Sequence, residues 1–504
     1  MIIFREQLIA LLPIIVIGIT IVGIMLSIIY SRNQFKHAVL TIIGMIIASV
    51  SSLLHMMWSM NKSGQNFFQL ICIDNFSVLY VILIMFVGIA SSILGYVWLV
   101  YYPVYRSDEF YLLLLIASIG GILLVITNHL IVLFLGIELI SISICGLISY
   151  PVFSKKSIEL SIKYIILSGV SSSFLLFGIV FIYCKTGSLS FIDIKEILST
   201  YNNVNHMLSQ PSMTLIVIGL SMMMIGMGFK LSCVPFHLWI SDIYQGTPTA
   251  VSMYLATGSK IAVTAVLMRF LLILPDQYNE LLHIFLSVSA CCSMLFGSLM
   301  AIPQISIKRM LAYSSITNAG YLLIALIALR MNNCAIIQES ISVYLVSYLF
   351  ANVGVWGIVN IVSTAYIQKE KNDADTIYLY HGLFWREPML SVIFVIAILS
   401  LAGIPMTFGF IGKFYLLFIG ISNQLWFLTV MMIISSIISM FYYLKIITNL
   451  FNSNFVNNTN INYDILKKWM IKPEGFMVII VAIIILFFGV YPQFIVNLIQ
   501  QFVI

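Results

Sequence analysis

Five charged side chains interrupt long apolar runs of this sequence, and all five are of types that bind and release protons. They are Glu138, Lys163, Lys230, Lys260 and Lys413. On insertion scales each charge near the middle of a bilayer costs roughly 2.5–3.5 kcal/mol, so four or five together cost on the order of 10 kcal/mol. Because buried ion pairs can often be replaced by apolar residues without loss of stability, a structural role explains this set poorly. We therefore interpret the five residues as functional.

The chemistry that suits these residues is proton transfer. A lysine in a low-dielectric site loses its proton more readily than a lysine in water, because desolvation disfavours the charged ammonium group. A nearby carboxylate has the opposite effect, so its movement away from a lysine could release a proton. Glu138 and Lys260 fall near the middle of their apolar runs. Charges about 10 Å apart interact by roughly 1.7 kcal/mol at an effective dielectric near 20, so the pattern predicts a row of coupled sites along the membrane plane.

Two further residues could take part. Glu159 lies four residues before Lys163, a spacing that lets the two side chains pair on one helix face. His237 follows Pro235 by two residues. This histidine could relay protons between neighbouring lysines, or it could bind carbonyl groups freed by the proline, and the sequence favours neither role.

Lys230 and Lys413 are expected beside broken helices. The run 388–421 would be about 51 Å long as a continuous helix, which exceeds a hydrocarbon core of roughly 30 Å. Pro405 removes a backbone donor in this run, and Pro235 does the same in the run 213–243. Unwound backbone inside a membrane is tolerated where protein covers it or where it lines a polar cavity. Helix ends at such a break carry partial charges that bind ions and water.

The elements that must position these residues are membrane helices. Of the 504 residues 61% are hydrophobic and 8% are charged, whereas soluble domains carry roughly 25% charge. The apolar residues come in helix-length blocks, and not in the alternating segments of a membrane β-barrel. We predict an all-α polytopic membrane protein with about 14 transmembrane helices, two of them broken. The expected spans are 8–30, 37–58, 77–101, 110–127, 129–150, 159–184, 213–243 (broken), 247–274, 280–302, 307–329, 340–366, 388–421 (broken), 424–451 and 474–500.

The basic residues outside the spans indicate the orientation, because cytoplasmic loops are enriched in Lys and Arg. Thirteen lie in the odd-numbered loops and five in the N-terminus and even-numbered loops. The odd-numbered loops should therefore face the cytoplasm of a bacterium, or the matrix of an organelle, with both termini on the opposite side. The net charge of +6 reflects this bias and gives no reason to expect nucleic acid as a partner. The thirteen are Arg32, Lys36, Arg106, Lys155, Lys156, Lys308, Arg309, Lys369, Lys371, Arg386, Lys467, Lys468 and Lys472.

The two broken runs suggest an internal repeat. We expect an N-terminal three-helix segment (1–109), a first five-helix repeat (110–274), a second five-helix repeat (280–451) and a C-terminal loop and helix (452–504). A unit with five spans reverses direction from one copy to the next, so the repeats would be inverted. The long outer loop 185–212 could hold a short interfacial helix.

Motifs for cofactors are missing from the sequence. The seven cysteines form no C-x-x-C pair, no G-x-G-x-x-G follows a strand pattern, and the histidines show no facing pair inside adjacent spans. We expect no iron–sulfur cluster, nucleotide, haem or other metal in this chain.

Several segments resemble the antiporter-like membrane subunits of respiratory complex I, and most closely those of the subunit N type. They are FLGIELIS, IKYIILSG, GFKLSCVPFHLW, DIYQGTP, IKRMLAYSSITNAGYLL and SLAGIPMTFGFIGKFY. The resemblance covers essentially the whole chain. It implies fourteen spans with two inverted five-helix repeats, and it places the proton-transfer residues at Glu138, Lys163, Lys230, Lys260 and Lys413.

The resemblance also implies the partners. NADH, FMN, the Fe–S clusters and quinone would belong to other subunits of the complex, so this chain would be part of a proton-translocating NADH:quinone oxidoreductase without a redox centre of its own. An antiporter-like subunit M and small membrane subunits would lie beside it in the bacterial cytoplasmic (inner) membrane.

Three other functions stay open. A subunit of a cation/proton antiporter complex shares the same ancestral fold, although a Na⁺ site would prefer clustered carboxylates and carbonyls. A stand-alone metabolite transporter would fit an inverted repeat, and a scaffold for assembly would fit a membrane protein without enzymatic motifs. The lysine row favours proton translocation over these three.

Overall fold

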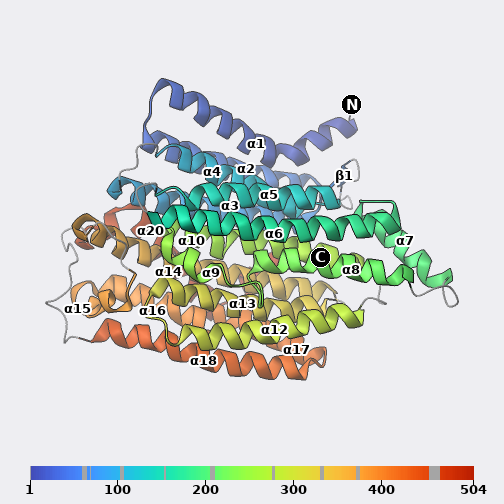
Figure 1. Ribbon diagram of the computed structural model, residues 1–504. Coiled ribbons are helices and arrows are strands. Elements are labelled where there is room, and N and C mark those ends of the chain that lie inside the picture. Colours follow the sequence, from blue (N-terminus) through green and yellow to red (C-terminus); the bar gives the residue numbers. More distant parts are fainter. Residues whose placement is uncertain are drawn as a thin grey trace.

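The computed structural model describes residues 2–59, 65–67, 70–102, 107–151, 155–204, 211–274, 279–329, 334–370, 375–452 and 466–503. Within these ranges the protein is a bundle of long helices that run in roughly the same direction (Figure 1). A short antiparallel hairpin, β1 (Gln65–Phe67) and β2 (Ile71–Ile73), is the one sheet in the described part of the chain. The predicted all-α membrane fold is confirmed.

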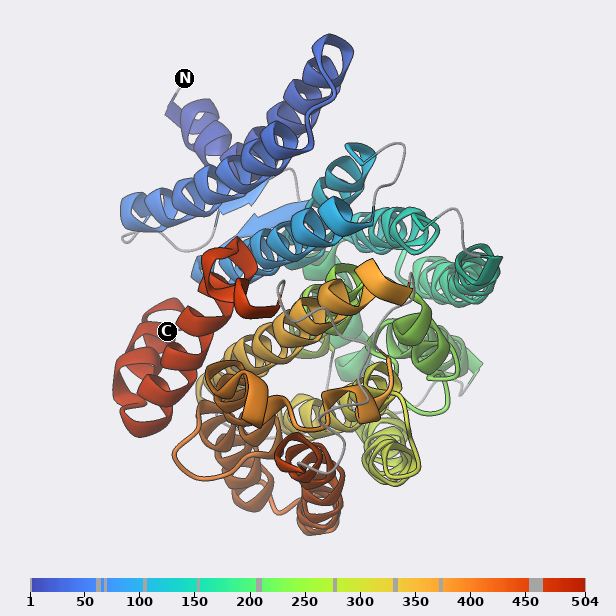
Figure 2. The ribbon, with the colours of Figure 1, turned by 90° about the vertical axis from the view of Figure 1, so that its left-hand side faces the viewer.

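Three helices begin the bundle: α1 (Ile2–Tyr30), α2 (Gln34–Ser59) and α3 (Asn75–Tyr101). A capping box fixes the start of α3, because the Asp74 side chain accepts from the Ser77 backbone and the Ser77 hydroxyl accepts from the Asp74 backbone. Seen along the bundle, α1 and α2 project from one edge (Figure 2). Most of α3 is buried, so it joins this edge to the rest of the protein.

The next helices surround Glu138 and three of the lysines. They are α4 (Glu109–Ile126), α5 (Leu130–Ile148), α6 (Lys155–Thr186), α7 (Phe191–Val204), α8 (Pro211–Leu231), α9 (Ile240–Gly246), α10 (Thr249–Ala256) and α11 (Gly258–Ile273). The helix expected in the outer loop 185–212 is present as α7. The broken run 213–243 is confirmed by α8 and α9, which are separated by non-helical backbone around Pro235.

The last helices surround the fourth lysine. They are α12 (Asn279–Ala301), α13 (Ile307–Ala328), α14 (Cys334–Glu370), η2 (Ile377–Tyr380), α15 (Leu383–Arg386), α16 (Pro388–Ala402), α17 (Phe408–Ser422), α18 (Trp426–Phe451), η3 (Trp469–Ile471), α20 (Pro473–Val490) and α21 (Gln493–Val503). The break in the run 388–421 is confirmed and separates α16 from α17.

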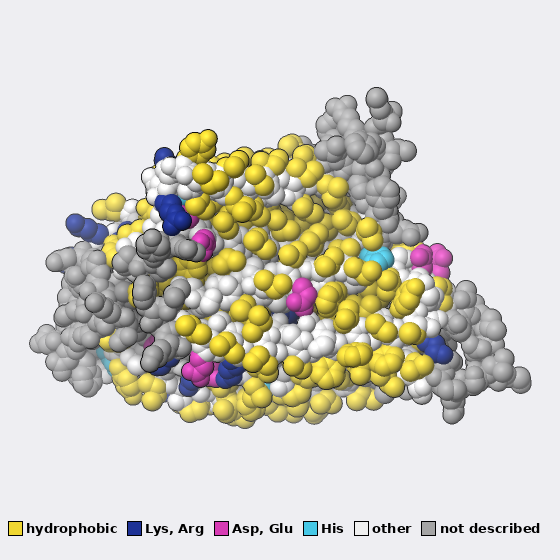
Figure 3. Space-filling model, turned by 45° about the horizontal axis from the view of Figure 1, so that its top comes forward, with side chains coloured by type: hydrophobic (Ala, Val, Ile, Leu, Met, Phe, Trp, Pro, Cys, Tyr) yellow, Lys and Arg dark blue, Asp and Glu magenta, His cyan; other side chains and the backbone are white. Residues whose placement is uncertain are grey.

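Thirteen helical stretches among the described residues are long and apolar enough to cross a membrane. Together with the broken pair α16 and α17 they account for the fourteen expected spans. The windows of α13 and α14 are 94% buried, so these two helices form the centre of the bundle. On the face shown in Figure 3 the surface between the two ends of the bundle is largely apolar, as a lipid-facing surface must be.

Two predicted spans differ from the observed helices. The run 247–274 is interrupted at Thr257, whose hydroxyl donates to the Met253 carbonyl at 2.7 Å, and a threonine bonded in this way bends a helix. The run 474–500 is two helices, because Pro492 disfavours helical backbone at the residue before it. The second of these helices, α21, is a separate amphipathic element at the C-terminal end.

Candidate functional site

Lys230 lies in the last turn of α8, where the helix breaks. Ser232, two residues later, has a φ of 60° and turns the chain out of the helix. The Lys230 side chain is buried, and its Nζ donates to the hydroxyls of Ser141 (2.6 Å) and Ser168 (2.8 Å). A longer contact of 3.5 Å reaches the Tyr164 hydroxyl. Residues of α5 and α6 therefore solvate this ammonium group with neutral oxygens.

Glu138 lies one turn before Ser141 on α5 but does not reach Lys230. Its carboxylate interacts electrostatically with Lys230, yet the two side chains form no ion pair in the described part of the chain. The Oε1 atom of Glu138 is buried and has no hydrogen-bond partner among the described residues. The buried lysine thus binds the Ser141 hydroxyl and not the carboxylate that could neutralise it.

Lys163 does not pair with Glu159, contrary to the expectation. Its Nζ binds the carboxylate of Asp242 on α9, which also accepts a hydrogen bond from Arg309 of α13 at 3.1 Å. Asp242 reaches Lys163 because α9 packs against α6, whereas Glu159 is exposed. The Lys163 and Asp242 side chains are 41% and 33% exposed, so this pair lies near the surface. No local pattern indicates that a residue 79 positions later provides the partner.

Lys260 lies at the start of α11, just after the interruption at Thr257. Its side chain is buried, and Nζ donates to the backbone carbonyl of Ser315 on α13 at 2.7 Å. The partner of this lysine is therefore a neutral oxygen from the second group of helices.

The Lys413 side chain, on α17, contacts the backbone at the break between α16 and α17. Its Nζ donates to the carbonyl of Ala402, the last residue of α16, at 2.8 Å and lies 5.4 Å from the ring centre of Tyr321. The negative end of the α16 dipole stabilises an ammonium group at this position. Gly403 follows with a φ of 80°, and a Cβ atom there would lie 2.6 Å from the Lys413 Cδ. A cavity of about 580 Å³ opens beside Lys413 between α17 and α18.

Three of the four buried lysines share one arrangement, whereas the fourth, Lys308, pairs with Asp375 at 3.5 Å. Lys230 is one residue from the end of α8, Lys260 is two residues after the start of α11, and Lys413 contacts the end of α16. Within the described residues each binds hydroxyl or carbonyl oxygens, and none forms an ion pair. Lysines held in this way can exist as ammonium or amine without leaving a buried carboxylate behind.

Buried tyrosines occupy the region between Lys260 and Lys413, which the sequence analysis did not identify. The Tyr344 hydroxyl donates to the Asn318 side chain at 3.1 Å, and the Tyr344 and Tyr348 rings stack with centres 6.3 Å apart. The Tyr321 hydroxyl accepts from Ser435 at 3.1 Å. Their only sequence signal is the spacing of four between the two tyrosines on α14, which places them on one helix face.

His237 lies in the break after α8. Its buried ring packs edge-on against Phe296 with centres 4.5 Å apart, and Nδ1 has no hydrogen-bond partner among the described residues. It hydrogen-bonds to neither Lys230 nor Lys260 in the described structure. A relay role for His237 stays a prediction.

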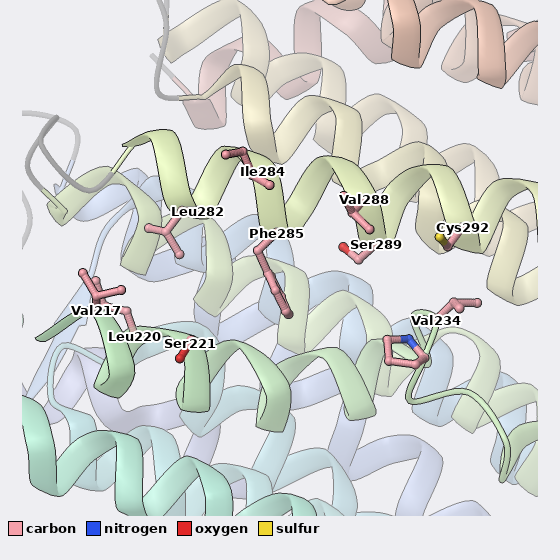
Figure 4. Close-up of a pocket in the computed structure, with 11 residues that line it drawn as sticks. Val217, Leu220, Ser221, Val234, Leu282, Ile284, Phe285, Val288, Ser289 and Cys292 are labelled. Carbon is pink, nitrogen blue, oxygen red and sulfur yellow. The ribbon is translucent and has the colours of Figure 1, made fainter. Parts of the chain in front are cut away.

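A second cavity, of about 600 Å³, lies between α8 and α12 and is almost entirely apolar. Phe285 of α12 points toward α8, and Val234 lies on the loop at the α8 break (Figure 4). None of the residues that line it is charged, so this cavity contributes no side chain that could carry a proton in the proposed row.

Comparisons with known proteins bear on the family and the fold of the chain. Residues 127–439 match the family described as "NADH:quinone oxidoreductase/Mrp antiporter, TM". A chain of respiratory complex I from Thermus thermophilus is similar in structure, with a TM-score of 0.76 and 24% identity, over 96% of this chain and 98% of that one.

Two further solved structures are similar. A chain of the membrane-bound sulfane sulfur reductase, an archaeal respiratory membrane complex, has a TM-score of 0.80 and 20% identity over 99% of this chain and 96% of that one. A chain of the Mrp complex from Dietzia sp. has a TM-score of 0.80 and 16% identity over 99% and 97%. At these identities the structures show a shared fold.

Proposed function

Because this chain belongs to the NADH:quinone oxidoreductase/Mrp antiporter transmembrane family, we propose that it translocates protons as a subunit of a bacterial NADH–quinone oxidoreductase, of the subunit N type. The observation that carries the proposal is that Lys230, Lys260 and Lys413 are buried and each is held by neutral oxygens at a helix interruption. In subunits L and M, which are related to N, the residue at the span-twelve position differs. A lysine at 413 therefore supports the N type.

In this proposal the lysines gain and lose protons in turn. Protonation of Lys230 or Lys260 converts an amine to an ammonium group that the surrounding hydroxyl and carbonyl oxygens can bind. Each new charge raises the cost of charging its neighbours, so a change at one site is passed to the next. Glu138 on α5 stabilises the ammonium form of Lys230 without direct contact, and Lys163 extends the row toward the surface through Asp242.

The energy for this movement would come from partner subunits. NADH, FMN, the Fe–S clusters and quinone would lie in those subunits, and quinone reduction would drive the charge changes from a distance. Subunit M and small membrane subunits would cover parts of the apolar surface. The complex would sit in the bacterial cytoplasmic (inner) membrane, with both termini of this chain on the periplasmic side.

The alternative is a subunit of a cation/proton antiporter complex, which the likeness to an Mrp chain supports equally at the level of the fold. The two functions differ in their dependence on Na⁺ and on quinone. Cation exchange in vesicles that hold the complex without an electron donor would favour the antiporter. Proton pumping that requires quinone reduction would favour the oxidoreductase.

The test replaces Lys413 in the intact complex. Lys413→Ala should assemble and should lower both quinone reduction and proton pumping in sealed vesicles. Lys445→Ala is the matched control, because Lys445 is an exposed lysine whose Nζ contacts a carbonyl at 3.4 Å and is expected to reach the membrane interface. Wild-type rates in Lys413→Ala would mean that the break and its lysine are structural.

A further inference from the structure

The last membrane helix carries a buried carboxylate that lies outside the proposed lysine row. Glu474 is in the first turn of α20, and its side chain is fully buried. Its Oε2 accepts from Nδ2 of Asn360 at 2.6 Å, while Oε1 is buried without a hydrogen-bond partner among the described residues. An unpaired buried oxygen loses its hydration without gaining a hydrogen bond, so it lowers the stability of the folded protein. Such a group in a native structure therefore points to a function.

Asn360 of α14 connects this carboxylate to two other helices. Its Nδ2 also donates to the Leu94 carbonyl of α3 at 3.3 Å, and its Oδ1 accepts from the Thr249 hydroxyl at the start of α10. Helix α14 packs against both α20 and α10, and all three belong to the helix bundle of Figure 1. The donors in this chain point toward Glu474, so they stabilise its charged form against burial.

Glu474 is placed near the membrane surface. Lys472, two residues earlier, is half-buried and its Nζ lies 4.6 Å from the ring centre of Tyr101. The loop before α20 is one of those that the distribution of Lys and Arg predicts to be cytoplasmic. A proton from the cytoplasm would therefore meet Glu474 before Lys230, Lys260 or Lys413.

A stripe of buried residues leads from Asn360 toward the middle of the membrane. Along α14 these residues recur every four positions, so each side chain lies next to the following one and the stripe winds around the helix. The Asn352 amide donates to the Tyr348 carbonyl at 2.8 Å, and the Trp356 Nε1 and the Tyr348 hydroxyl are buried without partners among the described residues. Buried polar atoms of this kind are the ones that internal water molecules bind. The stripe consists of Tyr344, Tyr348, Asn352, Trp356 and Asn360.

The stripe ends beside Lys413. A Cβ atom on Gly412 would lie 3.1 Å from the Tyr344 Cα, so the neighbour of Lys413 packs directly against this end of α14. The distance from Asn360 to Tyr344 along the helix is about 24 Å, most of the thickness of a hydrocarbon core. The winding row of side chains on α14 thus leads from Glu474 toward the region between Lys260 and Lys413.

We propose that Glu474 is a proton-uptake residue, which loads protons from the cytoplasmic side and passes them along the α14 stripe to the lysine row. Hydronium gives its proton to the free oxygen of the carboxylate and leaves water and a carboxylic acid. Transfer of that proton through water along the stripe to the amine of a lysine restores the carboxylate and forms the ammonium group. This inference rests on the proposed function.

The experiment compares Glu474→Gln with Glu474→Asp in the assembled complex. Glutamine keeps an oxygen that accepts from Asn360 but cannot carry a proton at this position, whereas aspartate keeps the carboxyl group. Assembly, quinone reduction and protons pumped per electron are measured in sealed vesicles. Glu474→Gln should assemble and lose more than half of the pumping, and Glu474→Asp should retain most of it.

A second variant tests the stripe itself. Asn352→Leu removes an amide that hydrogen-bonds to its own helix only, so it should leave the contacts of Glu474 intact and should still lower pumping. Wild-type pumping in Glu474→Gln, or its failure to assemble, would overturn the proposal and make the Asn360 contact structural. Lys413→Ala measured in parallel separates the two hypotheses, because it is impaired if the proposed function is correct, whatever Glu474 does.

Discussion

The ammonium group of Lys230 binds the hydroxyl of Ser141 and leaves the carboxylate of Glu138, one turn earlier on the same helix, without an ion pair among the described residues. A direct ion pair would hold the proton on the lysine. A hydroxyl as the direct partner lets the carboxylate stabilise the ammonium form from a distance while the amine form remains accessible. The charge on Lys230 can therefore respond to a movement of Glu138.

Ser141→Ala should impair proton pumping while leaving assembly intact. The change removes a hydrogen bond of a charged buried group, an interaction worth about 1.5–3 kcal/mol, and so should destabilise the ammonium form of Lys230. Pumping and quinone reduction in vesicles give the measurement. Ser143→Ala is the control, because the Ser143 hydroxyl donates to the backbone of its own helix at 2.7 Å. Equal effects of the two variants would refute a specific role for Ser141.

Gly403→Ala should abolish the geometry of the Lys413 site. The alanine would have to adopt a φ of 80°, which costs roughly 1–2 kcal/mol, and its Cβ would displace the Lys413 side chain. Gly187→Ala provides a matched control, since Gly187 has a φ of 67° and open space around its Cα. Thermal unfolding in detergent should show a loss of stability in both variants, and pumping should fall in Gly403→Ala alone. Normal pumping in Gly403→Ala would show that Lys413 can work from another position.

Asp242→Asn should change the free energy of unfolding by less than about 1 kcal/mol, because the ion pairs it makes with Lys163 and Arg309 are partly exposed. The same change leaves Lys163 free to turn toward the carboxylates of α5 and α6. A double-mutant cycle between Asp242→Asn and Lys163→Met, followed by thermal unfolding at low and high salt, measures the pair. A coupling energy well above that value, or one that salt does not reduce, would mean that the pair is more buried in the assembled complex.

The ring of Tyr321 should matter more than its hydroxyl. Lys413 lies 5.4 Å from the ring centre, a geometry in which an aromatic face stabilises a cation by about 0.5–2 kcal/mol. Tyr321→Phe keeps this ring, whereas Tyr321→Leu removes it. Pumping should therefore be close to that of the wild type in the first variant and lower in the second. The reverse order would assign the function to the hydrogen bond between Tyr321 and Ser435.

The membrane class, most span boundaries and the two broken helices could be predicted from the sequence, because they depend on local properties. Apolar runs of bilayer length are sufficient to define spans, and Pro235 and Pro405 interrupt a helix wherever they occur in its interior. The charged residues could be identified for the same reason, since a charge in an apolar run is visible without any knowledge of the fold. The interruption at Thr257 was missed, because a hydroxyl that bonds to its own helix leaves no distinctive pattern.

The partners of those charges depended on the tertiary structure. The spacing of four predicted that Lys163 pairs with Glu159, but packing of α9 against α6 places Asp242 closer. Likewise nothing local to Glu474 or Asn360 reveals that they meet, 114 residues apart, at the junction of α20 and α14. The sequence alone determined which side chains must avoid lipid, because the cost of burying a charge is a property of the residue and its neighbours along the chain. Only the folded bundle decided which oxygens they bind, because that depends on distances between helices that are remote in sequence.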